Sequence, residues 1–146
     1  MDVSCPVSTN KVNEIVIRII ALMVAIVGIA CLIVNNYTAI FFLMVDFGIR
    51  TFTSGKFSLL KIIALQIFKN ISTPTKLTDL APKKFAAALG FIFCLAICAF
   101  DTFQMHTVAT ILIITLIVFA ILESVFSICV GCYVYTFLQK IGLVRK

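Results

Sequence analysis

The sequence predicts an all-α membrane fold: four transmembrane helices, with a cytoplasmic-side amphipathic interfacial helix between the second and the third. Of the 146 residues, 62% are hydrophobic and only 12% are charged, and the mean hydropathy is +1.19. A soluble domain is typically about 45–50% apolar and about 25% charged. No polar stretch is long enough to fold separately in water, so we expect residues 1–146 to form a single integral membrane domain.

The first two apolar runs predict the first two spans. Ile15 to Val34 has the length of the ~20 helical residues that cross a ~30 Å hydrocarbon core. Its single internal charge, Arg18, is near enough to the end to snorkel. The second span, at about 37–52, is shorter and carries Asp46 and Arg50. These residues are four apart and share a helix face, so they can pair. An intramembrane acid costs about 2.5–3.5 kcal/mol on insertion scales, so we expect Asp46 to face protein or water.

The segment at about 57–71 has a different pattern. Its polar residues fall within one arc at 100° per residue, and the remaining positions are mostly Leu, Ile and Phe. These polar residues are Ser58, Lys61, Gln66, Lys69 and Asn70. The pattern indicates an amphipathic helix in the interface, and the alternative is a helix packed on the surface of the bundle.

The third and fourth spans follow a loop at 72–84. The third, at about 85–100, begins with small residues that allow close helix packing. The last apolar run starts at Thr107 and reaches about Leu138, which is too long for the membrane alone. We therefore expect the fourth span at about 107–130, and the end of the run to protrude, tilt or break near Gly131.

The basic residues predict the orientation in the membrane. Lys and Arg gather between the second and third spans and in the C-terminal tail, whereas the two other connections have none. The positive-inside rule then places both termini in the cytoplasm, for a multi-pass protein of the inner (cytoplasmic) membrane. The net charge of +6 does not indicate nucleic-acid binding, because no solvated basic face with interleaved aromatic residues is present.

Cys129 and Cys132 form a Cys-x-x-Cys pair, the arrangement in which a thiolate pKa is often lowered. On a continuous helix the pair would share one face with Cα atoms about 5 Å apart, a distance that a disulfide accepts. The predicted topology brings Cys5 to the same side. We expect reversible thiol–disulfide or persulfide chemistry at Cys129 and Cys132, with Cys5 as an exchange partner. The alternative is that these cysteines only pack a helix end.

Metal binding is the other use of a Cys-x-x-Cys pair, and it is the lesser alternative because a closed zinc site needs four ligands and no histidine is expected near these three cysteines. We assign no metal ligands. Arg18, Asp46, Arg50 and Glu123 form a predicted polar network that supports the thiol site. Each acid could pair with either arginine. Such residues could serve as buried ion pairs that hold the bundle together or as a proton relay.

Four stretches of the chain resemble a known family. They are Cys5-Pro6 followed by Val12-Asn13-Glu14, Val45-Asp46-Phe47 with Arg50, Ala81-Pro82-Lys83-Lys84-Phe85-Ala86-Ala87, and Glu123 with Cys129-Val130-Gly131-Cys132. In this order they cover nearly the whole chain and resemble the bacterial membrane proteins grouped as DUF4395. The resemblance implies a small multi-spanning protein and brings no activity or cofactor with it.

The leading interpretation is therefore a membrane thiol redox or sulfur-relay protein. A soluble thioredoxin-like protein or a membrane quinone could supply or accept the electrons, although no binding motif for either is present. The alternatives are a small transporter, in which Asp46, Arg50 and Glu123 line a path, and a non-catalytic accessory or scaffold subunit. The sequence leaves the cofactor, the substrate and the oligomeric state open, and also whether the protein is an enzyme.

Overall fold

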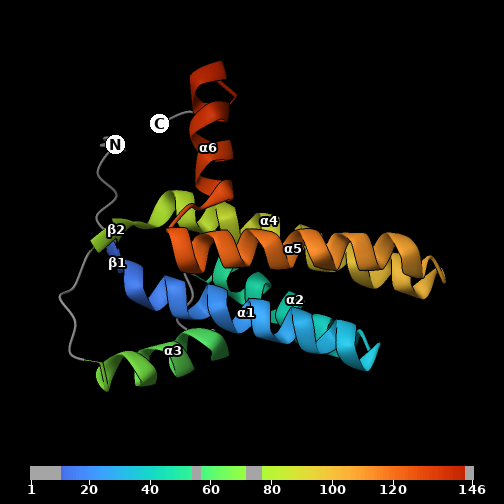
Figure 1. Ribbon diagram of the computed structural model, residues 1–146. Helices are drawn as coiled ribbons and strands as arrows, with labels where there is room; N and C mark the ends of the chain where they lie inside the picture. Colours follow the sequence, from blue (N-terminus) through green and yellow to red (C-terminus); the bar gives the residue numbers. More distant parts are fainter. Residues whose placement is uncertain (1–10, 54–56, 72–76, 144–146) are drawn as a thin grey trace.

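The computed structural model describes residues 11–53, 57–71 and 77–143, in which the chain forms six α-helices and two short strands (Figure 1). The helices are α1 (Glu14–Val34), α2 (Thr38–Phe52), α3 (Leu59–Lys69), α4 (Leu80–Thr102), α5 (His106–Phe126) and α6 (Val130–Ile141). The strands β1 (Lys11–Asn13) and β2 (Leu77–Asp79) pair antiparallel, with Lys11 opposite Asp79. The sequence did not predict this pairing, which joins the segment before α1 to the segment before α4.

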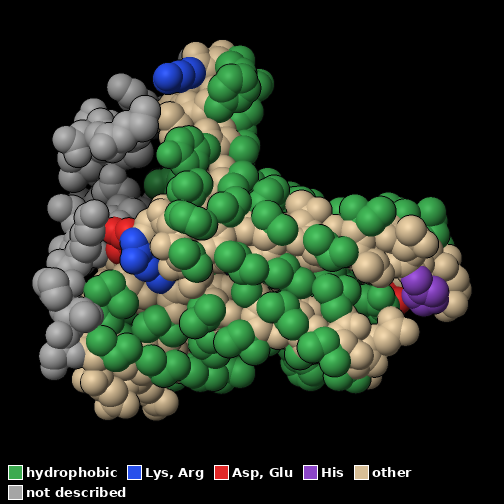
Figure 2. Space-filling view, in the orientation of Figure 1, with side chains coloured by type: hydrophobic (Ala, Val, Ile, Leu, Met, Phe, Trp, Pro, Cys, Tyr) green, Lys and Arg blue, Asp and Glu red, His purple; other side chains and the backbone are tan. Residues whose placement is uncertain are grey.

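Three helices of the described part are long and apolar enough to cross a membrane: Glu14–Val34, Pro82–Thr102 and His106–Phe126. Large apolar side chains on their outer faces are exposed, as expected of a surface that contacts lipid (Figure 2). Ile26, Ile92 and Ile111 are each more than half exposed, at 58%, 57% and 58%. The chain is therefore a helical membrane protein. At 15 residues, α2 is shorter than these three helices.

The core of the bundle lies between α1, α2, α4 and α5, which run alongside one another (Figure 1). The most extensive contacts join α1 to α5 and α2 to α4. Gly28 of α1 allows one of these close approaches, because a Cβ there would lie 2.7 Å from Cγ1 of Ile117. Small residues play this role in membrane bundles, where backbones approach closely and van der Waals packing drives association.

The helix α4 begins earlier than the sequence predicts. We expected a loop over 72–84, but the helix starts at Leu80, so Pro82 lies in its first turn. Proline is tolerated there because its missing N–H would have no intrahelical acceptor. The early start places Lys83 and Lys84 on the helix, at the same end of the bundle as the C-terminus of α5.

The last apolar run breaks before the predicted position. Ser127 ends α5 in the left-handed region, with φ 56°, and the N–H groups of Ser127 and Ile128 both donate to the carbonyl of Leu122. The run therefore breaks, one of the three expected outcomes, and the chain leaves α5 four residues before Gly131. A serine that can adopt φ > 0 ends this helix without glycine or proline. The helix α6 then leaves the bundle across the direction of α4 and α5 (Figure 1).

Candidate thiol site

The break in the chain places Cys129 at the N-cap of α6 rather than inside a continuous helix. Cys129 has an extended backbone, with φ −88° and ψ 102°, and its Sγ accepts the N–H of Cys132 at 3.4 Å. The sulfur thus lies at the positive end of the helix dipole, which stabilises a negative charge. Both thiols are free. We expected both cysteines on one face of a continuous helix. Instead, Cys129 caps α6 and Cys132 lies in its first turn.

Gly131 allows the start of α6 to lie directly against α4. A Cβ at this position would lie 2.7 Å from both Cα and Cβ of Ala86. No real Cβ approaches backbone atoms this closely, so any larger residue would push the two helices apart. The glycine is therefore used for close approach. Its effect is to hold the cysteine pair on the first turns of α4.

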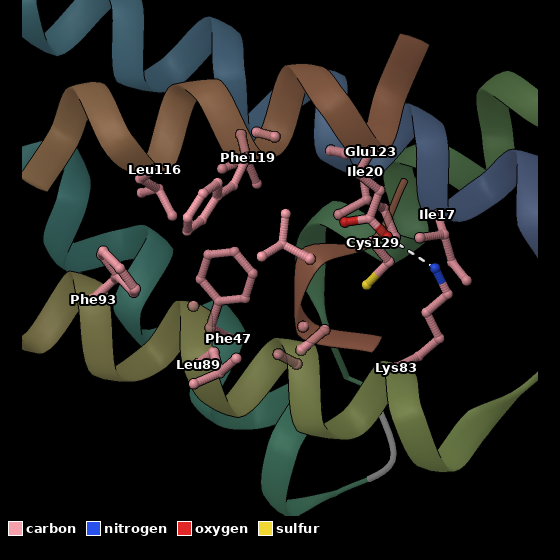
Figure 3. Close-up of a pocket in the computed structure, with 18 of the residues that line it drawn as sticks. Ile17, Ile20, Phe47, Lys83, Leu89, Phe93, Leu116, Phe119, Glu123 and Cys129 are labelled. Atoms are coloured by element: carbon pink, nitrogen blue, oxygen red, sulfur yellow. Dashed lines mark hydrogen bonds and ion pairs between the residues drawn. The ribbon is translucent and has the colours of Figure 1, made fainter. Parts of the chain in front are cut away.

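An ion pair lies beside the cysteine pair. Lys83 of α4 donates to Oε1 of Glu123 on α5 at 2.9 Å, and the two side chains are only 13% and 22% exposed. Figure 3 shows the Cys129 sulfur next to both groups and directed into a pocket. The sequence predicted Glu123 as part of the site but assigned Lys83 to a loop. Lys83 and Glu123 are 40 residues apart, and the antiparallel packing of α4 and α5 brings them together.

The two thiols are electrostatically unequal. The pKa of Cys129 lies below its ordinary value chiefly because the Cys132 thiol donates a hydrogen bond to its sulfur. Burial and the Glu123 carboxylate oppose this shift, whereas the Lys83 ammonium and the Cys132 backbone N–H add to it. The same hydrogen bond and burial raise the pKa of Cys132. Cys129 is therefore the member of the pair that loses its proton more readily.

A cavity of about 100 Å³ extends from Cys129 into the bundle, between α1, α2, α4 and α5 (Figure 3). Its walls are mainly apolar and include the rings of Phe47, Phe93 and Phe119. Gly90 makes room for the Phe47 ring, because a Cβ there would lie 2.9 Å from a ring carbon. The charged residues that line the cavity are Arg50, Lys83 and Glu123. The cavity is thus apolar along its length and polar near the cysteine.

Asp46 makes a structural connection instead of the ion pair that its spacing from Arg50 suggested. Its Oδ1 accepts the hydroxyl of Ser58 at 2.7 Å and the N–H of Leu60 at 3.3 Å. Ser58 is fully buried and caps α3 by accepting the N–H of Lys61. Asp46 therefore fixes the start of α3 to α2. The Arg50 guanidinium lies over the Phe47 ring, 5.6 Å from its centre.

We expect Asp46→Ala to lower the free energy of unfolding by about 1–3 kcal/mol, because it leaves a buried hydroxyl and a backbone N–H without their acceptor. The loss should be local at first, with faster hydrogen exchange at Leu60 and Lys61. Thermal unfolding and hydrogen exchange in detergent would measure both effects. Asp46→Asn keeps a carbonyl acceptor and should lose less. An unchanged exchange rate in the alanine variant would contradict this role.

The structure brings together part of the predicted site. Cys129, Cys132, Glu123 and Arg50 gather at one end of the bundle. Arg18 instead pairs with Glu14 on its own helix at 3.4 Å. Cys5 lies outside the described residues. Among the residues that are described, no group of three His, Cys, Asp or Glu side chains could hold a metal ion.

Lys83 is the site residue that the sequence analysis missed. One signal could have found it: a lysine at the start of one span and an acid at the end of the next must lie at the same membrane face when the spans are antiparallel. The other cysteines of the described part, Cys31, Cys94 and Cys98, lie on α1 and α4 away from this end.

The fold and the site together define a class: a small helical membrane protein with a thiol pair at the N-terminus of a helix that leaves the bundle. The chain belongs to the family described as Domain of unknown function (DUF4395), whose family model matches residues 12–140 and so covers most of the chain. The resemblance seen in the sequence motifs is thereby confirmed. No curated protein and no solved structure matches the chain.

Proposed function

We propose that this protein is a thiol–disulfide oxidoreductase of the cytoplasmic membrane, in which Cys129 and Cys132 alternate between a dithiol and a disulfide. The observation that carries the proposal is the Cys129 sulfur at the N-cap of α6, which accepts hydrogen bonds from the N–H and the thiol of Cys132. A packing role needs neither the cap position nor a cation beside the sulfur. Both features stabilise a thiolate.

The two cysteines have different roles in the proposed exchange. Cys129 is 6% exposed and lines the cavity, whereas Cys132 is more exposed. The thiolate of a soluble, thioredoxin-like dithiol protein would attack Cys132 of the oxidised pair. A bond forms between the partner sulfur and Cys132, the Cys129–Cys132 bond breaks, and Cys129 leaves as the thiolate. The thiol with the lower pKa is the better leaving group.

A second exchange completes the reaction. The second thiol of the partner loses its proton and attacks the first partner sulfur, so that the partner disulfide forms and Cys132 leaves. Cys132 takes up a proton and again donates to the Cys129 sulfur. The partner is oxidised by two electrons, and the Cys129–Cys132 disulfide is reduced by the same two electrons.

The proposed topology has four spans, α1, α2, α4 and α5, with α3 as the interfacial helix and both termini in the cytoplasm. The basic residues support this orientation. Arg50, Lys83 and Lys84 lie at the cysteine end, whereas the two turns at the opposite end, 35–37 and 103–105, contain neither Lys nor Arg. Figure 2 shows the histidine at that opposite end. The cysteine pair would then face the cytoplasm, where protein disulfides are usually transient and catalytic.

The orientation of α6 supports a position at the membrane surface. The helix runs across α4 and α5, contains no buried residue and exposes apolar side chains, including Tyr133, Val134 and Phe137 (Figure 1). A helix across the span direction lies along the bilayer plane, where such side chains enter the interface. This placement would hold the cysteine pair at the boundary between lipid and water.

A redox titration of the purified protein in lipid nanodiscs tests the proposal. The protein is equilibrated in thiol–disulfide buffers of graded potential, and all thiols are then alkylated and analysed by mass spectrometry. We expect Cys129 and Cys132 to oxidise together as a two-electron couple, while Cys31, Cys94 and Cys98 stay reduced. A pair that stays reduced at every potential would contradict the proposal and favour a transporter that uses Arg50 and Glu123.

A further inference from the structure

We infer that the cavity beside Cys129 binds the ring of a membrane quinone, which accepts the two electrons of the reduced Cys129–Cys132 pair. This inference rests on the proposed redox function and adds the electron acceptor. It starts from three properties of the cavity: its shape and lining, its position among the membrane helices, and the groups at its cysteine end.

The cavity has the lining of a site for one ring. Its volume is about 100 Å³, and its walls include Ile20, Leu116 and three phenylalanine rings. An engineered apolar cavity of about 150 Å³ takes up benzene, so this smaller cavity must widen by side-chain movement to accept a quinone ring. Phe93 and Phe119 already meet edge to face, with ring centres 5.9 Å apart, and aromatic edges and faces suit a flat ligand.

The walls of the cavity come from α1, α2, α4 and α5, three of which are the helices long enough to cross a membrane. The phase around these helices is hydrocarbon, so a ligand that entered the cavity between them would have to be lipid-soluble. A water-soluble protein disulfide or glutathione is too large and too polar to enter. A quinone combines an apolar ring and tail with the ability to accept two electrons.

The polar end of the cavity matches the chemistry of a quinone oxygen. Lys83 and Arg50 line the site as cations, and the Lys83 ammonium uses one of its three donors on Glu123. Further ammonium donors therefore remain for a ring carbonyl, where negative charge develops on reduction. The Cys129 sulfur is directed into the same space (Figure 3). One ligand would therefore meet both a nucleophile, Cys129, and a cation, Lys83, that stabilises the negative charge on its oxygen.

The reaction balances with the dithiol as reductant. The Cys129 thiolate adds to a ring carbon, forming an S–C bond, and one ring oxygen takes up a proton. The Cys132 thiol then loses its proton and its sulfur attacks Cys129, so that an S–S bond forms and the S–C bond breaks. The electron pair of that bond stays on the ring, and the second oxygen takes up a proton. One thiolate, one thiol, one quinone and one proton give one disulfide and one quinol.

The experiment uses the reduced full-length protein in nanodiscs without oxygen, with a ubiquinone analogue that carries a single isoprene unit. We expect stoichiometric quinol, followed by its absorbance, and loss of two alkylatable thiols at Cys129 and Cys132. A soluble aromatic disulfide serves as a second oxidant in a parallel sample. Oxidation of the pair by the disulfide but not by the quinone would overturn the quinone inference alone. A pair that neither reagent oxidises would overturn the redox function as well.

A matched pair of variants tests whether the quinone acts from the cavity. Ala120 is buried and lines the cavity, whereas its neighbour Ile121 is exposed on the lipid-facing side. Ala120→Phe adds a ring to the cavity and should lower the quinone reaction rate at least about tenfold, because a filled cavity has no room for a second ring. Ile121→Phe should leave the rate unchanged. Equal rates in both variants would overturn the assignment to this cavity.

The unmodified chain gives an independent readout if Ala120→Phe does not fold. The quinol product cannot oxidise the pair, so its binding is separable from the reaction. Bound quinol should protect Cys129 from alkylation by a small maleimide, while a tail alcohol without the ring should not. We expect protection to rise with quinol concentration and to be absent at Cys98, a partly buried thiol on α4 outside the cavity. Alkylation of Cys129 at the same rate with and without quinol would overturn the inference.

Discussion

Cys129→Ser and Cys132→Ser are each expected to lower turnover of a thioredoxin-like dithiol at least about 10³-fold, because removing one member of a catalytic unit disables the whole unit. The two variants should nevertheless differ in what they trap. With Cys129 replaced, the more exposed Cys132 should form a stable mixed disulfide with the activated partner protein. With Cys132 replaced, Cys129 is too buried for the protein and should react only with small apolar thiol reagents.

Trapping can be read on a non-reducing gel after mixing each variant with a thioredoxin-type protein whose attacking thiol has been activated. Cys98→Ala is the matched control, because Cys98 is a partly buried thiol on α4 outside the site. It should turn over and trap like the unmodified chain. A mixed disulfide formed by the Cys132→Ser variant and not by the Cys129→Ser variant would reverse the assigned roles.

The class of protein can be predicted from the sequence alone, because membrane-spanning helices are long stretches of uniformly high hydropathy. Only three of the four predicted spans correspond to helices long enough to cross a membrane. The motif at Cys129 and Cys132 was visible from spacing alone, and so was Glu123 as a nearby acid. These features depend on residue type and local order, which a sequence contains directly.

The geometry of the site depends on features that spacing does not encode. Ser127 adopts φ 56° and ends α5, although a serine in an apolar run carries no clear stop signal. This one backbone conformation turns the cysteine pair from a helix face into a helix cap. Asp46 has its buried partners 12 and 14 residues away, rather than at the i+4 position that helix periodicity suggests. Packing between elements selects such partners, and local periodicity cannot rank them.

Lys83→Met is expected to have the second largest effect, on both the stability and the reactivity of the site. The change leaves Glu123, 22% exposed, without its ion-pair partner beside Cys129. Removing one member of a buried pair is strongly destabilising, and here the loss should approach about 3 kcal/mol because the pair is only partly open to solvent. The same change removes a cation that lowers the pKa of Cys129. The alkylation of Cys129 should therefore need a higher pH.

The sign of the pKa shift separates an electrostatic role from a purely structural one. Glu123→Gln removes a carboxylate that raises the pKa of Cys129, so the alkylation curve should move to lower pH, opposite to Lys83→Met. Arg50 remains in both variants and keeps a cation at the cavity. Lys84→Met, which makes the same change in net charge one residue away, is the matched control and should leave the curve in place. If the alkylation curves of Lys83→Met and Glu123→Gln move in the same direction, the electrostatic role is contradicted. A general loss of packing does not depend on the charge of the residue that is removed, so it would not shift the two curves in opposite directions.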